Sequence, residues 1–414
     1  MKRIVQKFGG TSVRNEEGRH RALHHIKTAV ENGYKTVVVV SAMGRNGDPY
    51  ATDTLLGLID GNNTRVSNRE MDMLMSCGET ISSVVFSNML RKNGLNAAAI
   101  SGALAGFRTT ADHTNAKILE MDCSRLEEEL GKYDVVVVAG FQGQSETGDV
   151  TTLGRGGSDT SAAALGAALH AESVDIFTDV EGLMTADPRI VENARPLSQV
   201  TYNEISNMAY QGAKVIHPRA VEIAMNAKVP LRVRSTYSDT EGTLVTSHAN
   251  QSGMGSDIQD RLITGIAHVS DITQIRVSAK EGRYDMQSEV FKAMAAEQIS
   301  VDLINISPSN VVYTISEEKT ALAVNVLSEL GYEPDIVRNC AKVSVVGAAM
   351  AGVPGVTAKI VNALSSEGIQ ILQSADSHTT IWVLVREDDL HKAINTLHSA
   401  FKLAELQQSG NLNS

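Results

Sequence analysis

Short, nearly all-apolar segments alternate with long helical segments in the first 240 residues, and this alternation constrains the fold most strongly. Two of the segments are valine runs, at residues 37–40 and 135–138. A strand that is apolar on both faces is buried on both faces. The alternation therefore predicts an α/β fold with a mostly parallel sheet sandwiched by helices. Strands are expected at Arg3–Phe8, Thr36–Ser41, Val135–Ala139, Val174–Phe177 and Leu231–Arg234, and helices at residues 15–32 and 68–92.

Length, charge and cysteine content narrow the class of protein. A chain of 414 residues predicts two or three domains, and 42% hydrophobic with 21% charged residues is typical of a globular protein. The net charge of −11 argues against general nucleic-acid binding but permits a locally basic nucleotide pocket. The three scattered cysteines predict reduced thiols. No signal core and no 18-residue apolar run occurs, so we expect a cytoplasmic protein without membrane contact.

The C-terminal part contains a gapless internal repeat that aligns residue 290 with residue 360, an offset of 70. The same offset aligns VVYTI at 311–315 with IWVLV at 381–385. Each copy reads strand, helix, strand, strand, helix, which predicts two ferredoxin-like βαββαβ modules. A repeat that serves only to dimerise the chain is the alternative to one that binds an effector.

The segment TSHANQSGMGSDIQD separates the two parts of the chain. It is polar and without periodicity, and is therefore interpreted as a linker. The expected organisation is an α/β domain at 1–245, a linker at 246–260, modules at 261–338 and 339–403, and a flexible tail at 404–414.

A glycine-rich turn that enters a small-residue helix, GRGGSDTSAAALGAAL at residues 154–169, is the most informative local motif. Backbone N–H groups at a helix start can bind an anion, and the helix dipole favours negative charge there. The planar guanidinium of Arg155 suits a carboxylate or a phosphate. A tight turn before a close-packed helix explains the turn alone equally well.

Two further motifs place charged residues near strand ends or in helices. KFGGTS, at residues 7–12, ends the first strand; Gly9 and Gly10 permit close approach of a polyphosphate, and Lys7 supplies a positive charge. The alternative is a surface lysine beside a turn. CGET, at residues 77–80, carries Glu79, which can receive an ammonium group or be a solvated helix residue.

The segment at residues 177–189, FTDVEGLMTADPR, suits a nucleotide loop or a plain structural turn. Lys214, in GAKVIHPRA, is either a surface lysine or part of the same site, and His217 receives no role. No convincing Ser-His-Asp or Cys-His arrangement is present, and no metal site is predicted from the protein's own side chains.

Taken together, KFGGTSV, SAMG, SCGET, AGFQG, TTLGRGGSDTSA, TDVEGLMTADPR and LRVRSTYS resemble the aspartate kinases of the amino-acid kinase superfamily. The resemblance extends from residue 1 to about residue 401, and the repeat resembles paired ACT regulatory modules. The length resembles the monofunctional form. The resemblance implies ATP-dependent phosphorylation of the side-chain carboxylate of L-aspartate, with Mg²⁺, as a first step toward lysine, diaminopimelate, threonine and methionine.

The resemblance also implies roles for individual residues. Lys7, Arg155 and Asp159 correspond to the family's catalytic groups, and Glu79 corresponds to the residue that receives the substrate ammonium. The implied ATP contacts are Lys7, Phe8, Gly9, Gly10, Thr178, Asp179, Asp187, Arg189 and Lys214. The implied substrate contacts are Ser41, Thr52, Glu79, Arg155, Gly156, Gly157 and Ser158.

For the regulatory part, the resemblance implies a homo-oligomer joined through ACT modules and feedback inhibition by an amino acid, with lysine, threonine and meso-diaminopimelate as candidates. The implied effector contacts are Val353, Pro354, Gly355, Gln373 and Asp376. The first copy has SAKEGRYDMQ where the family usually has a proline-glycine turn. Two other functions stay open: a kinase acting on glutamate, N-acetylglutamate or carbamate, and a non-catalytic amino-acid sensor.

Overall fold

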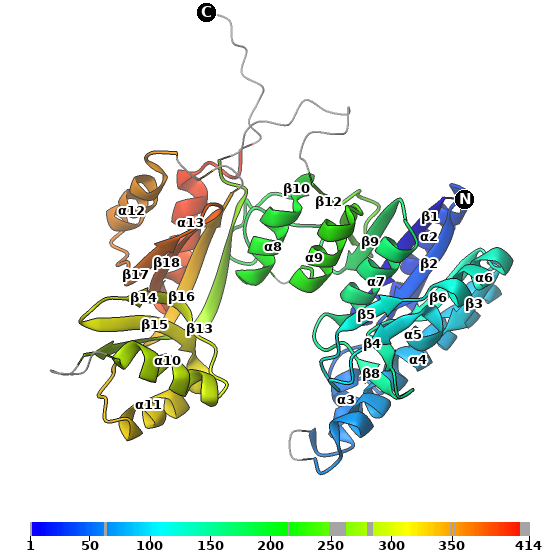
Figure 1. Cartoon of the computed structure of the whole chain (residues 1–414). Coiled ribbons are helices and arrows are strands. Elements are labelled where there is room, and N and C mark those ends of the chain that lie inside the picture. Colours follow the sequence, from blue (N-terminus) through cyan, green and yellow to red (C-terminus); the bar gives the residue numbers. More distant parts are fainter. Residues whose placement is uncertain are drawn as a thin grey trace, which may run out of the picture. The chain divides into compact units, whose positions relative to one another are not determined.

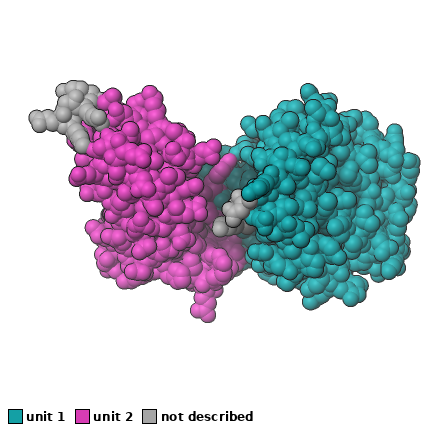
Figure 2. Space-filling model, turned by 90° about the horizontal axis from the view of Figure 1, so that it is seen from below, with its two compact units in different colours: residues 1–183, 196–209, 214–253 teal, residues 184–195, 210–213, 254–414 magenta. Residues whose placement is uncertain are grey.

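A computed structural model of the protein describes residues 2–61, 64–213, 215–247, 262–279, 285–347, 350 and 353–405. Its elements are labelled in Figure 1. The chain forms two compact units, coloured separately in Figure 2. Unit 1 comprises residues 1–183, 196–209 and 214–253, and unit 2 comprises residues 184–195, 210–213 and 254–414. The predicted linker, apart from its first two residues, and most of the predicted tail lie outside the described residues.

Unit 1 is built on an eight-stranded sheet with the order β10-β12-β11-β9-β1-β2-β6-β3. All neighbouring strands are parallel except β11 and β12. The expected fold class is confirmed, and all five predicted strands belong to this sheet. The strands are β1 (Arg3–Phe8), β2 (Lys35–Val40), β3 (Ala97–Ile100), β6 (Val135–Ala139), β9 (Ser173–Thr178), β10 (Gln199–Thr201), β11 (Leu231–Ser235) and β12 (Thr243–Thr246).

Helices cover both faces of this sheet. On one face α2 and α4 pack against Phe8, Val38 and Val137 in a single apolar cluster. On the other face the small residues of α7 allow close packing, since a Cβ at Gly166 would stand 2.2 Å from Val174. The helices of unit 1 are α1 (Gly10–Val13), α2 (Glu16–Glu31), α3 (Thr52–Gly57), α4 (Asn68–Lys92), α5 (Gly102–Ala105), α6 (Ser124–Lys132), α7 (Gly157–Ala168), α8 (Tyr202–Tyr210) and α9 (Pro218–Ala227).

The two long helices predicted from the sequence are present. Asn15 and Asn32 are the caps of α2, and the side chain of Asn15 accepts a hydrogen bond from Gly18. Helix α4 begins in a capping box between Ser67 and Glu70. These local signals explain why the helix limits were readable before the fold was known.

A second, four-stranded sheet in unit 1 was not predicted. Its order is β5-β4-β7-β8, formed by β4 (Phe107–Thr109), β5 (Ile118–Met121), β7 (Gln142–Ser145) and β8 (Val150–Thr152). Its strands have three or four residues, too few to show a periodic pattern. This sheet matters for function because β8 leads directly into the arginine-bearing turn.

Unit 2 contains one antiparallel six-stranded sheet with the order β14-β15-β13-β16-β18-β17. Its strands are β13 (Gly265–Ser278), β14 (Asp302–Ile306), β15 (Asn310–Ser316), β16 (Asp335–Val346), β17 (Gln373–Asp376) and β18 (Thr380–Arg386). Its helices are α10 (Met286–Ala296), α11 (Thr320–Glu329), α12 (Val356–Ser366) and α13 (Leu390–Ala400).

The two ferredoxin-like modules share the long strands β13 and β16. The C-terminal half of β13 pairs with β15 and with residues 335–340 of β16, which completes the first module. Residues 265–269, the N-terminal half of β13, pair with residues 342–346. They supply the fourth strand of the second module, although they precede the first module in the chain. Strand β16 runs through the predicted boundary between residues 338 and 339.

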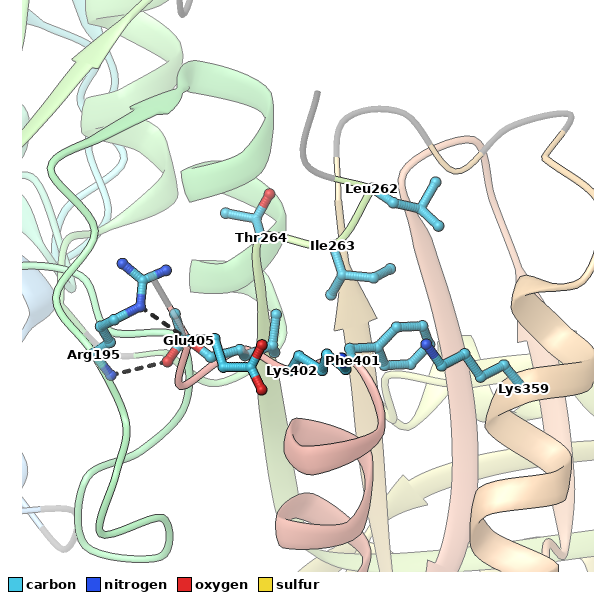
Figure 3. A pocket seen from close by; sticks show the side chains of 10 residues that line it. Arg195, Leu262, Ile263, Thr264, Lys359, Phe401, Lys402 and Glu405 are labelled. Carbon is cyan, nitrogen blue, oxygen red and sulfur yellow. Dashed lines mark hydrogen bonds between the residues drawn. The ribbon is translucent and has the colours of Figure 1, made fainter. Parts of the chain in front are cut away.

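A small cavity of about 240 Å³ lies within unit 2 (Figure 3). Arg195 borders it and donates from Nε to the carbonyl of Leu403 at 3.2 Å. Lys359 also borders it, with Nζ 4.9 Å from the ring centroid of Phe401. None of the five predicted effector residues lines this cavity.

Three of those five residues lie in the turn before α12, and the other two lie on β17. Gly355 caps α12 with a left-handed φ of 94°, and Val353 and Pro354 are exposed before it. Gln373 accepts a hydrogen bond from Gln274 at 2.8 Å, and Asp376 is exposed at the end of β17. Their effector role stays a prediction. The segment of the first copy that departs from the family pattern lies partly outside the described residues.

Candidate active site

Loops at the carboxyl ends of neighbouring parallel strands meet around a cavity of about 960 Å³ in unit 1. Strands β1, β2 and β6 are adjacent, and each is followed by a glycine-containing turn. Ligands bind at such strand ends in α/β sheets. The predicted residues that line this cavity are Lys7, Gly10, Ser41, Thr52, Glu79, Arg155, Gly156, Gly157, Ser158 and Asp159.

Lys7 and Asp159 form an ion pair at the cavity, with Nζ and Oδ1 2.8 Å apart. Both side chains are 13% exposed. Lys7 lies on β1, and Asp159 lies in the first turn of α7, where the helix dipole favours a carboxylate. The backbone N–H of His217 donates to the other oxygen of Asp159 at 3.2 Å. The structure therefore brings the lysine near the N-terminus to the helix that follows the arginine-bearing turn.

The turn after β1 packs tightly on the turn after β2. A Cβ at Gly10 would stand 2.7 Å from the carbonyl oxygens of both Ala42 and Gly44, so only glycine fits there. The N–H of Gly44 donates to the carbonyl of Gly10 at 3.0 Å. This packing brings Lys7 and Ser41 to the same wall of the cavity.

The arginine-bearing turn also depends on glycine. Gly154 and Gly156 have left-handed φ values of 75° and 70°, and a Cβ at Gly156 would stand 2.1 Å from the His217 ring. This conformation presents Arg155, which is exposed and lines the cavity. Among the described residues Arg155 has no hydrogen-bond or ion-pair partner, so its guanidinium is available to an anionic ligand.

Glu79 is a buried carboxylate that faces the same cavity. It is 3% exposed, and Oε1 accepts a hydrogen bond from the N–H of Ala42 at 3.1 Å. Oε2 has no partner among the described residues. Burial raises the pKa of Glu79 to about 8. A buried acceptor without a partner costs free energy, so this group favours a ligand that brings a positively charged donor.

Several residues predicted to contact ATP do not themselves line the cavity. The ring of Phe8 is buried and stacks on Phe177 with 4.6 Å between the ring centroids, and Phe8 does not line the cavity. Thr178 ends β9, and Asp179 pairs with Arg45 at 3.0 Å. Gly9 precedes α1.

The other predicted ATP contacts belong to unit 2 or lie outside the described residues. Asp187 and Arg189 pair with each other at 2.6 Å within unit 2. Lys214 lies outside the described residues. The nucleotide roles of all these residues stay predictions.

The cavity residues that escaped the sequence analysis include Arg45, Thr114 and Phe141. Arg45 lines the cavity and pairs with Asp179. Thr114 and Phe141 line it with left-handed φ values of 71° and 69°, a conformation that non-glycine residues rarely adopt. Phe141 stands in the AGFQG motif, which marked the position, whereas the loop that carries Thr114 has no local signal.

Comparison with known proteins agrees with this geometry. The model of the amino acid kinase family matches residues 2–235, and an ACT domain model matches residues 335–399. The fold and the site therefore define an amino acid kinase with ACT domains.

Full-length relatives narrow the class. Aspartokinase 1 of Bacillus subtilis (strain 168) is 66% identical over 405 residues, which cover 98% of this chain and all of that protein. The structure of E. coli aspartokinase III in complex with aspartate and ADP matches with a TM-score of 0.75 at 27% identity, covering 96% of this chain and 99% of that one. Its complex with lysine and aspartate matches equally well. The chain belongs to the aspartokinase family.

Proposed function

We propose that the protein transfers the γ-phosphoryl group of ATP to the side-chain carboxylate of L-aspartate, forming 4-phospho-L-aspartate and ADP. Membership of the aspartokinase family supports this reaction. The observation that carries it structurally is the Lys7–Asp159 pair in a cavity that also receives Arg155 and Glu79. The ammonium of Lys7 thus lies beside the carboxylate of Asp159. Arg155 suits the carboxylate of an amino acid, and Glu79 suits its ammonium group.

Lys7 reduces the repulsion between the reactants. A carboxylate and a triphosphate are both anions, and two unit charges ~4 Å apart repel by about 4 kcal/mol at an effective dielectric constant near 20. The ammonium of Lys7 offsets this repulsion, most strongly in the transition state. Asp159 holds Lys7 in place through the 2.8 Å ion pair.

Arg155 and Glu79 position the substrate. The guanidinium of Arg155, with Ser158 beside it, receives the α-carboxylate, and Glu79 receives the ammonium group. The side-chain carboxylate is already ionised at pH 7, so attack on phosphorus needs no general base. A blocked amine, as in N-acetylglutamate, would leave Oε2 of Glu79 without a donor, so the site favours a free amino acid.

The site also fits Mg²⁺ delivered with ATP. Among the described residues no group of three or more His, Cys, Asp or Glu side chains could hold a metal ion by itself. Mg²⁺ commonly binds one or two carboxylates together with phosphate oxygens and waters. Asp159 is the cavity carboxylate beside Lys7 and would hold the ion, which supplies charge neutralisation at the phosphates.

Regulation and assembly are proposed from unit 2. An amino acid binding to the ACT modules would inhibit the enzyme by favouring an inactive state. A homo-oligomer is supported by the edge strand β14, where Ile304 and Ile306 are 47% and 58% exposed. An exposed apolar edge strand can pair with the edge of another chain.

The cysteines and the helices bear on location. Cys77, Cys123 and Cys340 are free thiols, which supports a reducing compartment such as the cytoplasm. In the part of the chain that the structure describes, no helix has the length and apolar character needed to cross a membrane.

An acceptor panel tests the proposed reaction. ADP release would be coupled to a spectrophotometric readout with L-aspartate, L-glutamate, N-acetyl-L-glutamate or carbamate as acceptor. We expect turnover with aspartate and at least about 100-fold lower kcat/KM with the others, since each misplaces a charged group. Turnover with another acceptor but not with aspartate would refute the proposal, and no turnover with any acceptor would favour a sensor.

A further inference from the structure

Two segments far apart in the sequence support the arginine-bearing turn. One is the loop at residues 114–116, between β4 and β5, and the other is the end of β8 at residues 152–153. They are joined by a hydrogen bond from the N–H of Ala116 to the carbonyl of Thr152 at 2.9 Å. The turn rests directly on this loop, since a Cβ at Gly154 would stand 2.8 Å from Oδ1 of Asn115.

Asp72, on α4, binds both segments from one side. It is fully buried, and both of its oxygens accept from the N–H of Thr114 at 3.1 Å. The hydroxyl of Thr152 donates to Oδ1, and Nδ1 of His113 donates to Oδ2 at 2.8 Å. A buried carboxylate is tolerated when donors satisfy it in this way.

Arg219, on α9, binds the same two segments from another helix. Its Nη1 donates to the carbonyl of Leu153 at 2.9 Å, and its Nη2 donates to the carbonyl of Ala116 at 3.0 Å. The planar guanidinium can hold two carbonyls in a defined relation, which an ammonium cannot do. Two charged side chains from two helices therefore fix one short stretch of backbone.

The placement of Asp72 links this stretch to the other end of the substrate. Asp72 and Glu79 stand seven residues apart on α4 and are both buried, so they lie on the same face of the helix. The helix that presents the proposed ammonium acceptor therefore also holds the strand end that leads into Arg155.

We propose that Asp72 and Arg219 are positioning residues that set the separation between Arg155 and Glu79, and thereby select an acceptor of aspartate length. This inference rests on the proposed function. Lys7 is held by β1, and Asp159 is held by its ion pair with Lys7 and by the backbone N–H of His217. Neither substitution removes these contacts, so loosening the turn acts on the amino-acid substrate more than on ATP binding.

The test measures KM for aspartate and KM for MgATP in full-length variants. Asp72→Asn keeps the shape of the side chain but removes its negative charge. Arg219→Lys keeps the positive charge but removes the planar guanidinium that binds two carbonyls at once. Each is expected to raise KM for aspartate about tenfold, to leave KM for MgATP within about twofold, and to raise the glutamate-to-aspartate ratio of kcat/KM.

Two variants of Thr152 and one variant of a carboxylate outside the site complete the test. Thr152→Val removes the donor to Asp72 and is expected to raise KM for aspartate about fivefold, whereas Thr152→Ser retains the donor and stays near wild type. Asp175 is a comparably buried carboxylate that pairs with Arg234 at 3.3 Å and does not line the cavity. Asp175→Asn should lower the stability of the protein without changing either KM value or the glutamate-to-aspartate ratio of kcat/KM.

The outcomes separate the two claims. If the wild type phosphorylates aspartate but folded Asp72→Asn, Arg219→Lys and Thr152→Val all keep its KM and selectivity, the inference is overturned. Equal changes in both KM values would overturn it too, because they indicate general loosening. If the wild type does not phosphorylate aspartate, the proposed function itself fails.

Discussion

The two units of the protein differ in the charged side chains that they bury. Unit 1 buries several carboxylates, among them Glu79 at the cavity and Asp72 behind the arginine-bearing turn. The charged side chain buried in unit 2, among its described residues, is Lys342, which pairs with Asp302. Unit 2 instead contains two apolar cores built alike. Buried charge costs free energy unless it is paired, as Asp175 is with Arg234, whereas apolar burial supplies stability.

The cores of unit 2 follow the sequence repeat. Met294 and Leu364, related by the offset of 70, are both at most 1% exposed and occupy the same place in the two modules. Tyr313 and Val383 are related in the same way. The comparison teaches that substitutions of the charged cavity residues of unit 1 should act on turnover, and matched core substitutions in unit 2 should act on unfolding.

The largest expected effect is on turnover. Lys7→Ala should lower kcat about 10³-fold, because it removes the cation that offsets reactant repulsion, with the fold retained. Coupled ADP release and circular dichroism measure the two properties. Lys2→Ala, on an exposed side chain that pairs with Glu172 at 3.5 Å, is the control and should keep full activity. Near-normal turnover of Lys7→Ala would remove Lys7 from the site.

The next effect is on stability. Met294→Ala and Leu364→Ala should each lower the free energy of unfolding by about 3 kcal/mol, since each leaves a cavity in an equivalent core. Urea unfolding followed by circular dichroism measures the change, and kcat at 25 °C without effector should stay within about twofold. If one variant were neutral in stability, the two cores would not be equivalent.

A smaller effect concerns pH. Because burial raises the pKa of Glu79 to about 8, the group is largely protonated at pH 7, and binding of the substrate ammonium must displace that proton. KM for aspartate should therefore fall about tenfold for each pH unit between pH 6 and 7 and level off above pH 8.

The matched variant for this pH dependence is Glu79→Gln. It cannot ionise, so KM for aspartate should be high and flat over the same range. A wild-type KM that does not change between pH 6 and 8 would contradict the proposed role of Glu79.

Much of this arrangement was readable in the sequence for physical reasons. The valine runs identified central strands, because only buried strands tolerate apolar residues on both faces. Lys7 lies at the end of β1 and Ser41 follows β2, and parallel strands bring their carboxyl ends to one edge. Arg155 instead follows β8 of the second sheet, which was not predicted. Motifs at strand ends therefore predicted which loops would meet.

Other features depend on tertiary structure alone. Asp72 looks like an ordinary helix residue, and nothing near it in the sequence indicates Thr114 or Thr152 as partners. The sharing of β13 between modules was equally hidden, since the repeat showed which segments correspond but not which strands would pair. Partners separated by dozens of residues are chosen by packing and carry no local signal.

One measurement tests the central claim most directly: a crystal structure of the protein with L-aspartate, Mg²⁺ and a non-hydrolysable ATP analogue. We expect the aspartate between Arg155 and Glu79, with its side-chain carboxylate directed at the γ-phosphate beside Lys7. An aspartate bound in unit 1 away from Arg155, or a triphosphate bound away from Lys7, would contradict the account.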